Sequence, residues 1–212
     1  MASPVDERVV GDLVERHAIA GRVPIAQWDL AFHSERLVAT RGDGLRLAFS
    51  REELAKNTDL LLGLVLRALV IREPAKGSIT LTPPVTAALR RFLDPVLRDH
   101  IAAALKRRLR LSLPIGALVV LTSLPALGLP LDIGGLIFGG GLIAMALVSK
   151  LWTHRALFLV DAALWLVLAT NNALRLAGGQ SPALYGTFAA LGVLFAIGSA
   201  RIFGFYGQPP AR

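Results

Sequence analysis

Residues 111–149 form a stretch of 39 residues that contains a single charged side chain, Asp132. One membrane-spanning helix needs about 20 apolar residues to cross a hydrocarbon core about 30 Å thick. The stretch is therefore long enough for two spans. Their connection is predicted at Gly128-Leu129-Pro130-Leu131-Asp132, because these residues combine helix breakers with a charge that favours the headgroup region.

Two further apolar stretches follow, and a turn at Gly178-Gly179-Gln180-Ser181-Pro182 separates them. Residues 111–212 hold only seven charged side chains in 102 positions, too few to cover the surface of a water-soluble domain. We therefore predict a four-helix transmembrane bundle over residues 111–206, followed by a cytoplasmic tail at 207–212. The predicted spans are about 111–129, 133–151, 156–174 and 183–202.

The first 110 residues hold 31 charged side chains, an ordinary density for a folded aqueous domain. We predict a small cytoplasmic α+β domain over residues 1–83. Its expected elements are a helix over 4–17, a β-hairpin over 37–49 with a turn at 41–44, a helix from the Ser50–Glu53 capping box to about Ile71, and a strand over 78–82. Residues 25–39 fit either a helix or a strand. The whole chain is thus expected to be an α-helical integral membrane protein.

Residues 84–110 have the pattern of an amphipathic connector helix, with a kink expected at Pro95. The connector ends in four cations directly before the first span: Lys106, Arg107, Arg108 and Arg110. Such a cluster either binds anionic lipid headgroups or serves as the positive flank that remains on the cytoplasmic side of a membrane. In both interpretations the lipid bilayer is a partner.

Orientation is predicted from the short flanks of the spans, where Lys and Arg favour the cytoplasmic side. With both termini inside, seven basic residues lie in inner flanks and only Arg175 lies in an outer connection. The N-terminal residues lack a basic segment followed by an apolar one, so no signal peptide is expected. We predict a multi-pass protein of the inner (cytoplasmic) membrane with cytoplasmic N- and C-termini.

Asp161 is the most suggestive residue for chemistry, because an ionised carboxylate in a membrane span is costly. Helical spacing places it on one face with His154, Trp165, Leu168 and Asn172. Asp161, Asn172 and His154 are therefore candidates for a transport path for protons or a small cation. The structural alternative is that Asp161 lies near the inner headgroups and pairs with Arg155 or Lys150.

Small residues recur at four-residue steps in two of the spans, at Gly135 and Gly139 and at Gly192, Ala196 and Ala200. Such stripes let helix backbones approach closely. They predict that the second and fourth spans pack together, or that they form the interface of a homo-oligomer.

Known enzyme motifs give little support for catalysis. Ser199 with His154 suggests an intramembrane hydrolase, but a membrane serine is ordinarily bonded to its own helix. The sequence contains no phosphate-binding loop, dinucleotide fingerprint or zinc motif, so no cofactor or metal is expected. Nucleic acid is not expected as a partner, because the basic residues crowd the edges of apolar spans.

These observations predict a non-enzymatic membrane protein. Its cytoplasmic domain is expected to bind a partner or sense a signal, while the bundle serves as an anchor or as a subunit of a membrane complex. The alternative is a small proton- or cation-linked carrier or channel that uses Asp161 and Asn172. An intramembrane enzyme is the third hypothesis.

Overall fold

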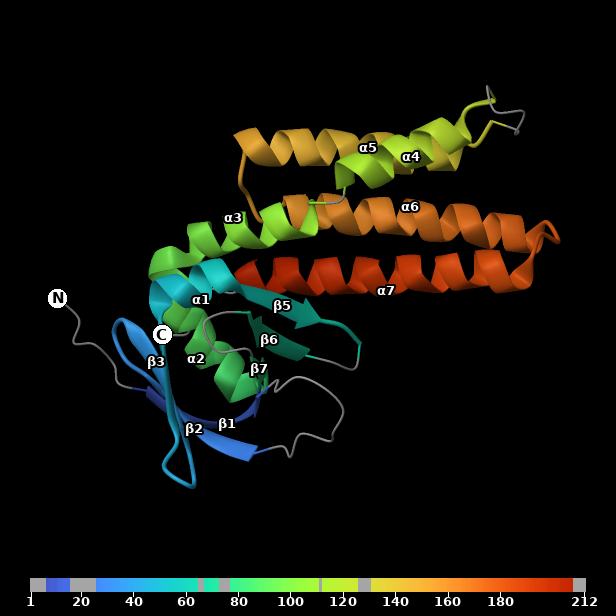
Figure 1. Ribbon diagram of the computed structural model, residues 1–212. Coiled ribbons are helices and arrows are strands. Elements are labelled where there is room, and N and C mark those ends of the chain that lie inside the picture. The colour runs from blue at the N-terminus through green and yellow to red at the C-terminus, as the bar shows by residue number, and fades with distance from the viewer. Residues whose placement is uncertain are drawn as a thin grey trace. The chain divides into compact units, whose positions relative to one another are not determined.

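The computed structural model describes residues 7–15, 26–64, 67–72, 77–110, 112–125 and 131–207. Contacts divide the chain into two compact units (Figure 1). Unit 1 comprises Met1–Ala104 together with Phe205–Arg212, and unit 2 comprises Leu105–Gly204. The predicted connector over 84–110 is therefore shared between the units.

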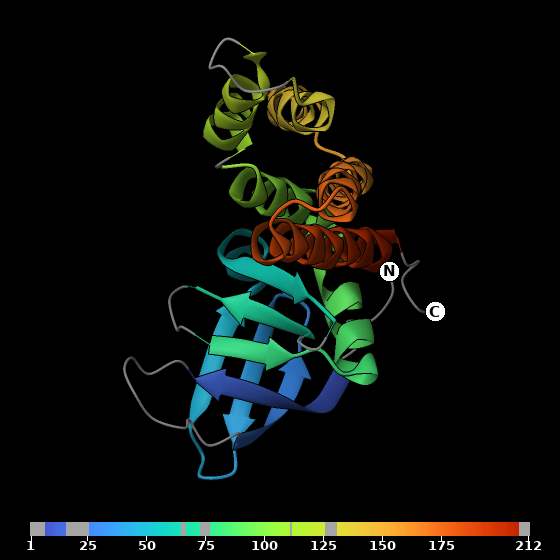
Figure 2. The same cartoon turned by 90° about the vertical axis from the view of Figure 1, so that its right-hand side faces the viewer.

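Unit 1 is built on a seven-stranded sheet in which every neighbouring pair is antiparallel. The strand order is β4-β3-β2-β1-β7-β6-β5, so β1 joins two meanders at the centre of the sheet (Figure 2). The strands are β1 (Glu7–Glu15), β2 (Ala26–Phe32), β3 (Arg36–Arg41), β4 (Arg46–Ser50), β5 (Thr58–Leu62), β6 (Arg67–Ile71) and β7 (Gly77–Thr80). The small N-terminal domain of strands and helices expected from the sequence is present.

Local signals in the middle of unit 1 are confirmed. The hairpin of β3 and β4 turns at Gly44, whose φ of 90° is a conformation that glycine adopts without strain. The capping box is also present: the Glu53 amide donates to Ser50 Oγ at 3.1 Å, and the Ser50 amide donates to Glu53 Oε2 at 2.8 Å. It opens α1 (Arg51–Asn57).

The predicted helix over residues 4–17 is wrong, because residues 7–15 form strand β1. The segment contains β-branched Val9, Val10 and Val14, and Gly11 lowers helix propensity in its middle. Antiparallel pairing with β2 on one side and β7 on the other then satisfies its backbone. The pairing of this segment with two neighbouring strands therefore outweighs the helical spacing of its valines.

The predicted helix from Ser50 to Ile71 is also wrong beyond its first two turns. Helix α1 ends at Asn57, and the leucine-rich segment that follows forms the hairpin of β5 and β6. Thr58, Leu60 and Leu62 are buried on alternate positions of β5, which is the period of a strand with one face in a core. Pairing of β6 with β7 adds this hairpin to the sheet, and the predicted strand at 78–82 appears as β7.

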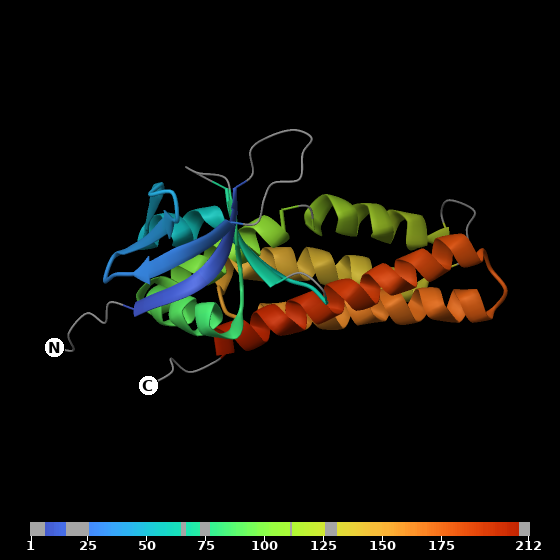
Figure 3. The same ribbon diagram turned by 90° about the horizontal axis from the view of Figure 1, so that it is seen from below.

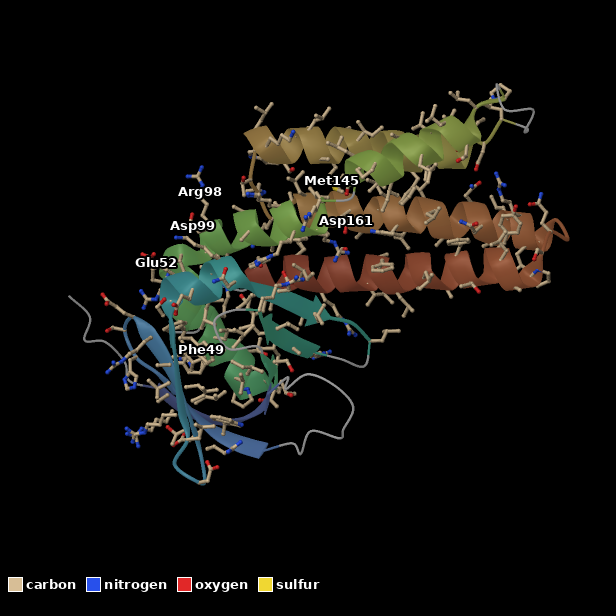
Figure 4. All side chains as sticks on the ribbon, viewed as in Figure 1. Phe49, Glu52, Arg98, Asp99, Met145 and Asp161 are labelled. Atoms are coloured by element: carbon tan, nitrogen blue, oxygen red, sulfur yellow. The ribbon has the colours of Figure 1, made fainter. Side chains whose placement is uncertain are left out.

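The core of unit 1 lies between the sheet and α2 (Pro83–Leu93). Alternate strand residues and one face of α2 are buried, and Phe32 meets Phe92 edge-on at 5.6 Å between ring centroids. Figure 4 marks Phe49, which is 2% exposed. The interruption expected at Pro95 is present, because the short 3₁₀ turn η1 (Asp94–Val96) separates α2 from α3 (Leu97–Arg108).

The described residues of unit 2 comprise the end of α3 and four further helices, of which the last continues into unit 1: α4 (Ser112–Ser123), α5 (Ile133–Leu151), α6 (Leu157–Ala177) and α7 (Pro182–Gly207). Three of them, α5, α6 and α7, are long and apolar enough to cross a membrane. This finding fits the predicted membrane protein. Helix α4 has 12 residues, about 18 Å, so the predicted four-span bundle is not established by helix length.

The small-residue stripes pack helices that the sequence analysis did not pair. A Cβ atom at Gly139 of α5 would lie 2.8 Å from the Gly116 carbonyl oxygen of α4. A Cβ atom at Gly192 of α7 would lie 2.8 Å from the Trp165 carbonyl oxygen of α6. Within unit 2 the stripes thus bring α5 against α4 and α7 against α6, and Figure 3 shows these two helix pairs.

Candidate functional site

A buried ionic cluster joins three helices at one end of unit 2. Arg108 of α3 donates from Nε to Asp161 Oδ2 of α6 at 2.6 Å, and from Nη2 to Ser199 Oγ of α7. The Ser199 hydroxyl in turn donates to Asp161 Oδ2 at 2.5 Å. Asp161 is 3% exposed and Ser199 is fully buried. The carboxylate is marked in Figure 4.

Trp165 completes the environment of this carboxylate. It lies one turn after Asp161 on α6, and its Nε1 donates to Asp161 Oδ1 at 3.1 Å. Both carboxylate oxygens therefore accept hydrogen bonds, and the negative charge faces a guanidinium. A buried charge is tolerated when it is paired and hydrogen-bonded in this way. These contacts explain how a carboxylate is accommodated among the apolar helices of unit 2.

A second ionic cluster lies at the other end of unit 2. Asp132 caps α5, accepting from the Gly135 amide at 3.0 Å, and it pairs with Arg175 of α6 at 2.6 Å. Asn171 Nδ2 donates to Asp132 Oδ1 at 3.1 Å, and the Arg175 guanidinium lies over the Tyr185 ring of α7 at 5.6 Å. Burial by itself raises the pKa of Asp132, but the Gly135 amide, Arg175 and Asn171 outweigh it, so the pKa is lowered.

The two clusters lie near opposite ends of α6. Asp161 and Arg175 are 14 residues apart on α6, which corresponds to about 21 Å along the helix axis. Helix α4 covers nearly the same distance. It begins just after Arg108, and the carbonyl of its last residue, Ser123, accepts from the Asp132 amide at 3.1 Å.

Two cavities lie between these clusters, and both are lined only by residues of unit 2. The larger, about 650 Å³, has walls from α4, α5, α6 and α7. The smaller, about 140 Å³, adjoins Arg108 and Asp161. They share three lining residues, Ile115, Trp165 and Phe195. Trp165 stacks on Phe195 at 4.6 Å, so this aromatic pair stands between the two cavities.

The predicted polar face of α6 faces the interior of the bundle. Trp165, Leu168 and Asn172 line the larger cavity, and Asp161 lines the smaller one. Asn172 donates from Nδ2 to the Leu168 carbonyl of its own helix at 2.7 Å. His154 is not part of this face: it lies before α6, stacks on Trp152 at 5.0 Å, and accepts from the Ala156 amide through Nδ1.

The partner of Asp161 was not identified from the sequence. Arg155 and Lys150 were expected as partners, yet Arg108 makes the pair, and Arg155 lies over the Phe203 ring at 5.3 Å. Arg108 is thus set apart from the three other cations of the predicted headgroup cluster. Lys106 and Arg110 are exposed and Arg107 is half-buried. Headgroup binding by these three stays a prediction.

The Asp132–Arg175 pair was likewise missed, because its members lie 43 positions apart, one at the start of α5 and the other in the last turn of α6. The sequence offered one signal: Asp132 and Arg175 are the only charged residues near the predicted outer ends of the spans. Ser199 was considered as a nucleophile with His154. Its hydroxyl instead donates to a carboxylate that Arg108 holds, which leaves that carboxylate poorly suited to serve as a base.

A third buried polar cluster lies in unit 1. His100 of α3 is fully buried, with Nε2 at 3.0 Å from Thr58 Oγ1 and Nδ1 at 3.1 Å from the Tyr206 hydroxyl. Thr58 Oγ1 donates to the Leu54 carbonyl, so it accepts from His100 Nε2–H. These contacts join α3, β5 and the last residues of α7.

Comparisons with protein families, with characterised proteins and with solved structures find no match to this chain. Among the residues that the structure describes, no group of three or more His, Cys, Asp or Glu side chains is placed to hold a metal ion.

Proposed function

We propose that this chain is a non-enzymatic integral membrane protein in which the sheet domain of unit 1 binds a cytoplasmic partner. The helices of unit 2 anchor that domain in the inner membrane, either as a homo-oligomer or as a subunit of a membrane complex. Binding at the domain is transmitted to the bundle through the two helices that the units share.

The observation that carries this proposal is the contact of Tyr206 with His100. It makes the end of the last apolar helix part of the sheet domain. The domain thus holds the start of α3, which leads into the bundle, and the end of α7, which leads out of it. A passive anchor needs one attachment, whereas two attached helices allow a change in the domain to alter the bundle.

The same contact supports a membrane topology with four crossings. Residues before and after these helices belong to one compact unit, and on that ground we propose that they lie on the same side of the membrane. The number of crossings must then be even, and α5, α6 and α7 supply three. We assign the fourth to α4, which extends between the same two ionic clusters as the longer helices. The excess of basic residues in the inner flanks favours cytoplasmic termini.

The edges of the sheet are the favoured surfaces for a partner. Strands β4 and β5 are the outer strands, and an outer strand offers backbone groups for pairing with another chain. The β5 edge also exposes apolar side chains: Leu61 is 41% exposed, and Leu64 follows it in the connection to β6. Arg46 is exposed at the β4 edge.

Site-specific photo-crosslinking in native membranes tests the proposal. A photoreactive amino acid is placed at Leu61, at Arg46 and, as a matched control, at Ser181 in the exposed connection between α6 and α7. We expect a discrete protein adduct from at least one edge position and none of the same mass from Ser181. The result contradicts the proposal if neither edge position gives an adduct at native expression and the purified chain is a lone monomer in detergent.

A carrier is the second candidate, because one face of α6 lines two adjoining cavities between the ionic clusters. In this hypothesis Asp161 and Asn172 serve protons or a small cation on either side of Trp165. Proteoliposomes containing the chain should then show pH-dependent flux that Asp161→Asn abolishes. Flux that is absent, or unchanged in the variant, excludes this role.

A further inference from the structure

We propose that the larger cavity of unit 2 is a binding site for one uncharged amphiphile, a molecule with a hydrocarbon body and a hydroxyl, carbonyl or amide head. The inference concerns the bundle alone and goes beyond the partner that we propose for the sheet domain. Its failure leaves the crosslinking result unaffected.

The cavity has the size and lining of a ligand site. Its volume of about 650 Å³ lies within the range of about 300–1,000 Å³ that is usual for small-molecule sites. Such sites are mostly apolar, with a few polar groups that orient the ligand. Here the apolar walls include Ile115, Phe138, Phe188 and Leu191. Because three of the four lining helices, α5, α6 and α7, are apolar enough to cross a membrane, a ligand that partitions into lipid can reach them.

Polar side chains gather at one end of the cavity, beside the Asp132–Arg175 pair. Asn172, Gln180 and Tyr185 line the cavity there. The Asn172 amide uses Nδ2 for the Leu168 carbonyl. Asn172 is 7% exposed as a residue, and its Oδ1 accepts no hydrogen bond from the residues that the structure describes. An acceptor left unpaired in the lining of a cavity favours a ligand that brings a donor.

The charges around the cavity argue against an ionic head. Asp132 and Arg175 are the charged residues of the lining, and each neutralises the other at 2.6 Å. Arg175 also lies over the Tyr185 ring, which holds its guanidinium in place. An anionic or cationic head would have to break this pair and leave one partner unmatched in a partly desolvated position, which is unfavourable. The remaining polar lining residues are uncharged.

Trp165 provides a reporter for occupancy, since it lines the cavity and shields its inner end with Phe195. The chain has three tryptophans. A Trp28→Phe, Trp152→Phe variant retains Trp165 alone. The matched control, Trp28→Phe with Trp165→Phe, retains Trp152, which is 52% exposed and lies outside the cavity. Trp28 Nε1 makes no hydrogen bond within the described residues, so Trp28→Phe, which both variants share, removes no hydrogen bond.

The experiment titrates the purified full chain in detergent micelles with a monoacylglycerol brominated on its acyl chain, which quenches nearby tryptophan fluorescence. Lysolipids with the same brominated chain and a zwitterionic phosphocholine or an anionic phosphoglycerol head serve as charged comparators. We expect saturable quenching of Trp165 by the monoacylglycerol, weaker binding of both comparators, and only non-saturable quenching of Trp152.

Two pairs of variants locate the binding site. Val119→Phe fills the cavity from α4 and should raise the half-saturating concentration about tenfold or more. Its control, Leu118→Phe, changes the adjacent residue, which is 62% exposed and not in the lining, and should leave binding unchanged. Leu184→Phe fills the cavity from the half-exposed start of α7 and should act like Val119→Phe, which guards against misfolding of the first variant.

The proposal is overturned if quenching of Trp165 is non-saturable and matches that of Trp152. It is also overturned if cavity-filling variants that fold, as judged by gel filtration and circular dichroism, bind as tightly as the natural sequence. Equal or tighter binding of a charged comparator contradicts the assignment to uncharged amphiphiles.

Discussion

The charges of Arg108 and Asp161 can both lie within unit 2 because the two side chains form an ion pair. The Asp161 side chain is 4% exposed and that of Arg108 is 25% exposed, so solvent screens the pair only from one side. Removing one partner leaves the other charge buried without compensation, which is far worse than removing both. The stability of single and double variants of these two residues therefore tests whether the charges compensate each other.

Arg108→Met should destabilise the bundle by about 2–3 kcal/mol, the lower end of the range for broken buried pairs because Arg108 is partly exposed. In a chain of this size that corresponds to a fall in Tm of very roughly 5–10 °C in detergent. Arg108→Met with Asp161→Leu should recover most of the loss. Lys106→Met, an exposed neighbour, serves as the control. Additive losses in the double variant would show that the two side chains are not coupled.

Asp132 gives the opposite end of the bundle a defined pH dependence. Its folded-state pKa lies below the ordinary value of 3.8, because the Gly135 amide, Arg175 and Asn171 together outweigh burial. A lowered pKa means that ionised Asp132 stabilises the fold above about pH 4 and that this contribution is lost as pH falls through the folded-state pKa. The difference in Tm between the natural chain and Asp132→Asn should therefore be constant above about pH 5 and should narrow as the pH falls below about 4. A difference in Tm that does not narrow would contradict the assignment.

Residue spacing predicted which way Asp161 and Asn172 face but not what they contact. Helical periodicity is local, so the 161, 165, 168 and 172 face could be read from the sequence. The Arg108 pair joins residues 53 positions apart, and no local pattern encodes it. The same holds for Asp132 with Arg175. A charge that flanks a span fits both a headgroup contact and an ion pair.

At the scale of elements, the clearest dependence is the crossing of α4 and α5 at Gly116 and Gly139. Gly139→Ala adds one methyl group at 2.8 Å from the Gly116 carbonyl oxygen, and backbone there cannot move aside cheaply. We expect a loss of about 1–3 kcal/mol. The neighbouring Gly140→Ala meets nothing within 4 Å and should be neutral or slightly stabilising, because alanine is the better helix former. Thermal unfolding of the two variants checks this contrast, and equal Tm values would contradict the crossing.

Sequence patterns were sufficient for elements whose signals are local. The Ser50–Glu53 capping box, the turn at Gly44 and the break at Pro95 were predicted and are present. The strands β1 and β5–β6 were mistaken for helices because their valines and leucines also fit a helical spacing. Both segments become strands through pairing with β7, a partner distant in sequence from β1. Propensity is a weak guide where sheet pairing decides.

For the whole molecule, the most informative feature is the division of the chain into two units, because residues from both ends of the chain belong to unit 1. The sequence predicted a soluble domain followed by membrane helices, and the structure adds that the end of the last helix belongs to the domain. Contact between residues 100 and 206 has no local signature in the sequence. It is nevertheless the contact on which we base the proposal of an even number of crossings, with α4 as the fourth.

Substituted-cysteine accessibility tests this topology most directly, since the natural chain contains no cysteine. Single cysteines are placed at Gly42, Leu131, His154 and Ser181, all exposed, and labelled with a membrane-impermeant maleimide in closed vesicles of known orientation. Labelling after permeabilisation controls for reactivity. The account predicts that Gly42 and His154 react from the cytoplasmic side and that Leu131 and Ser181 react from the opposite side. Reaction of Leu131 from the same side as Gly42 would remove the crossing by α4 and contradict the account.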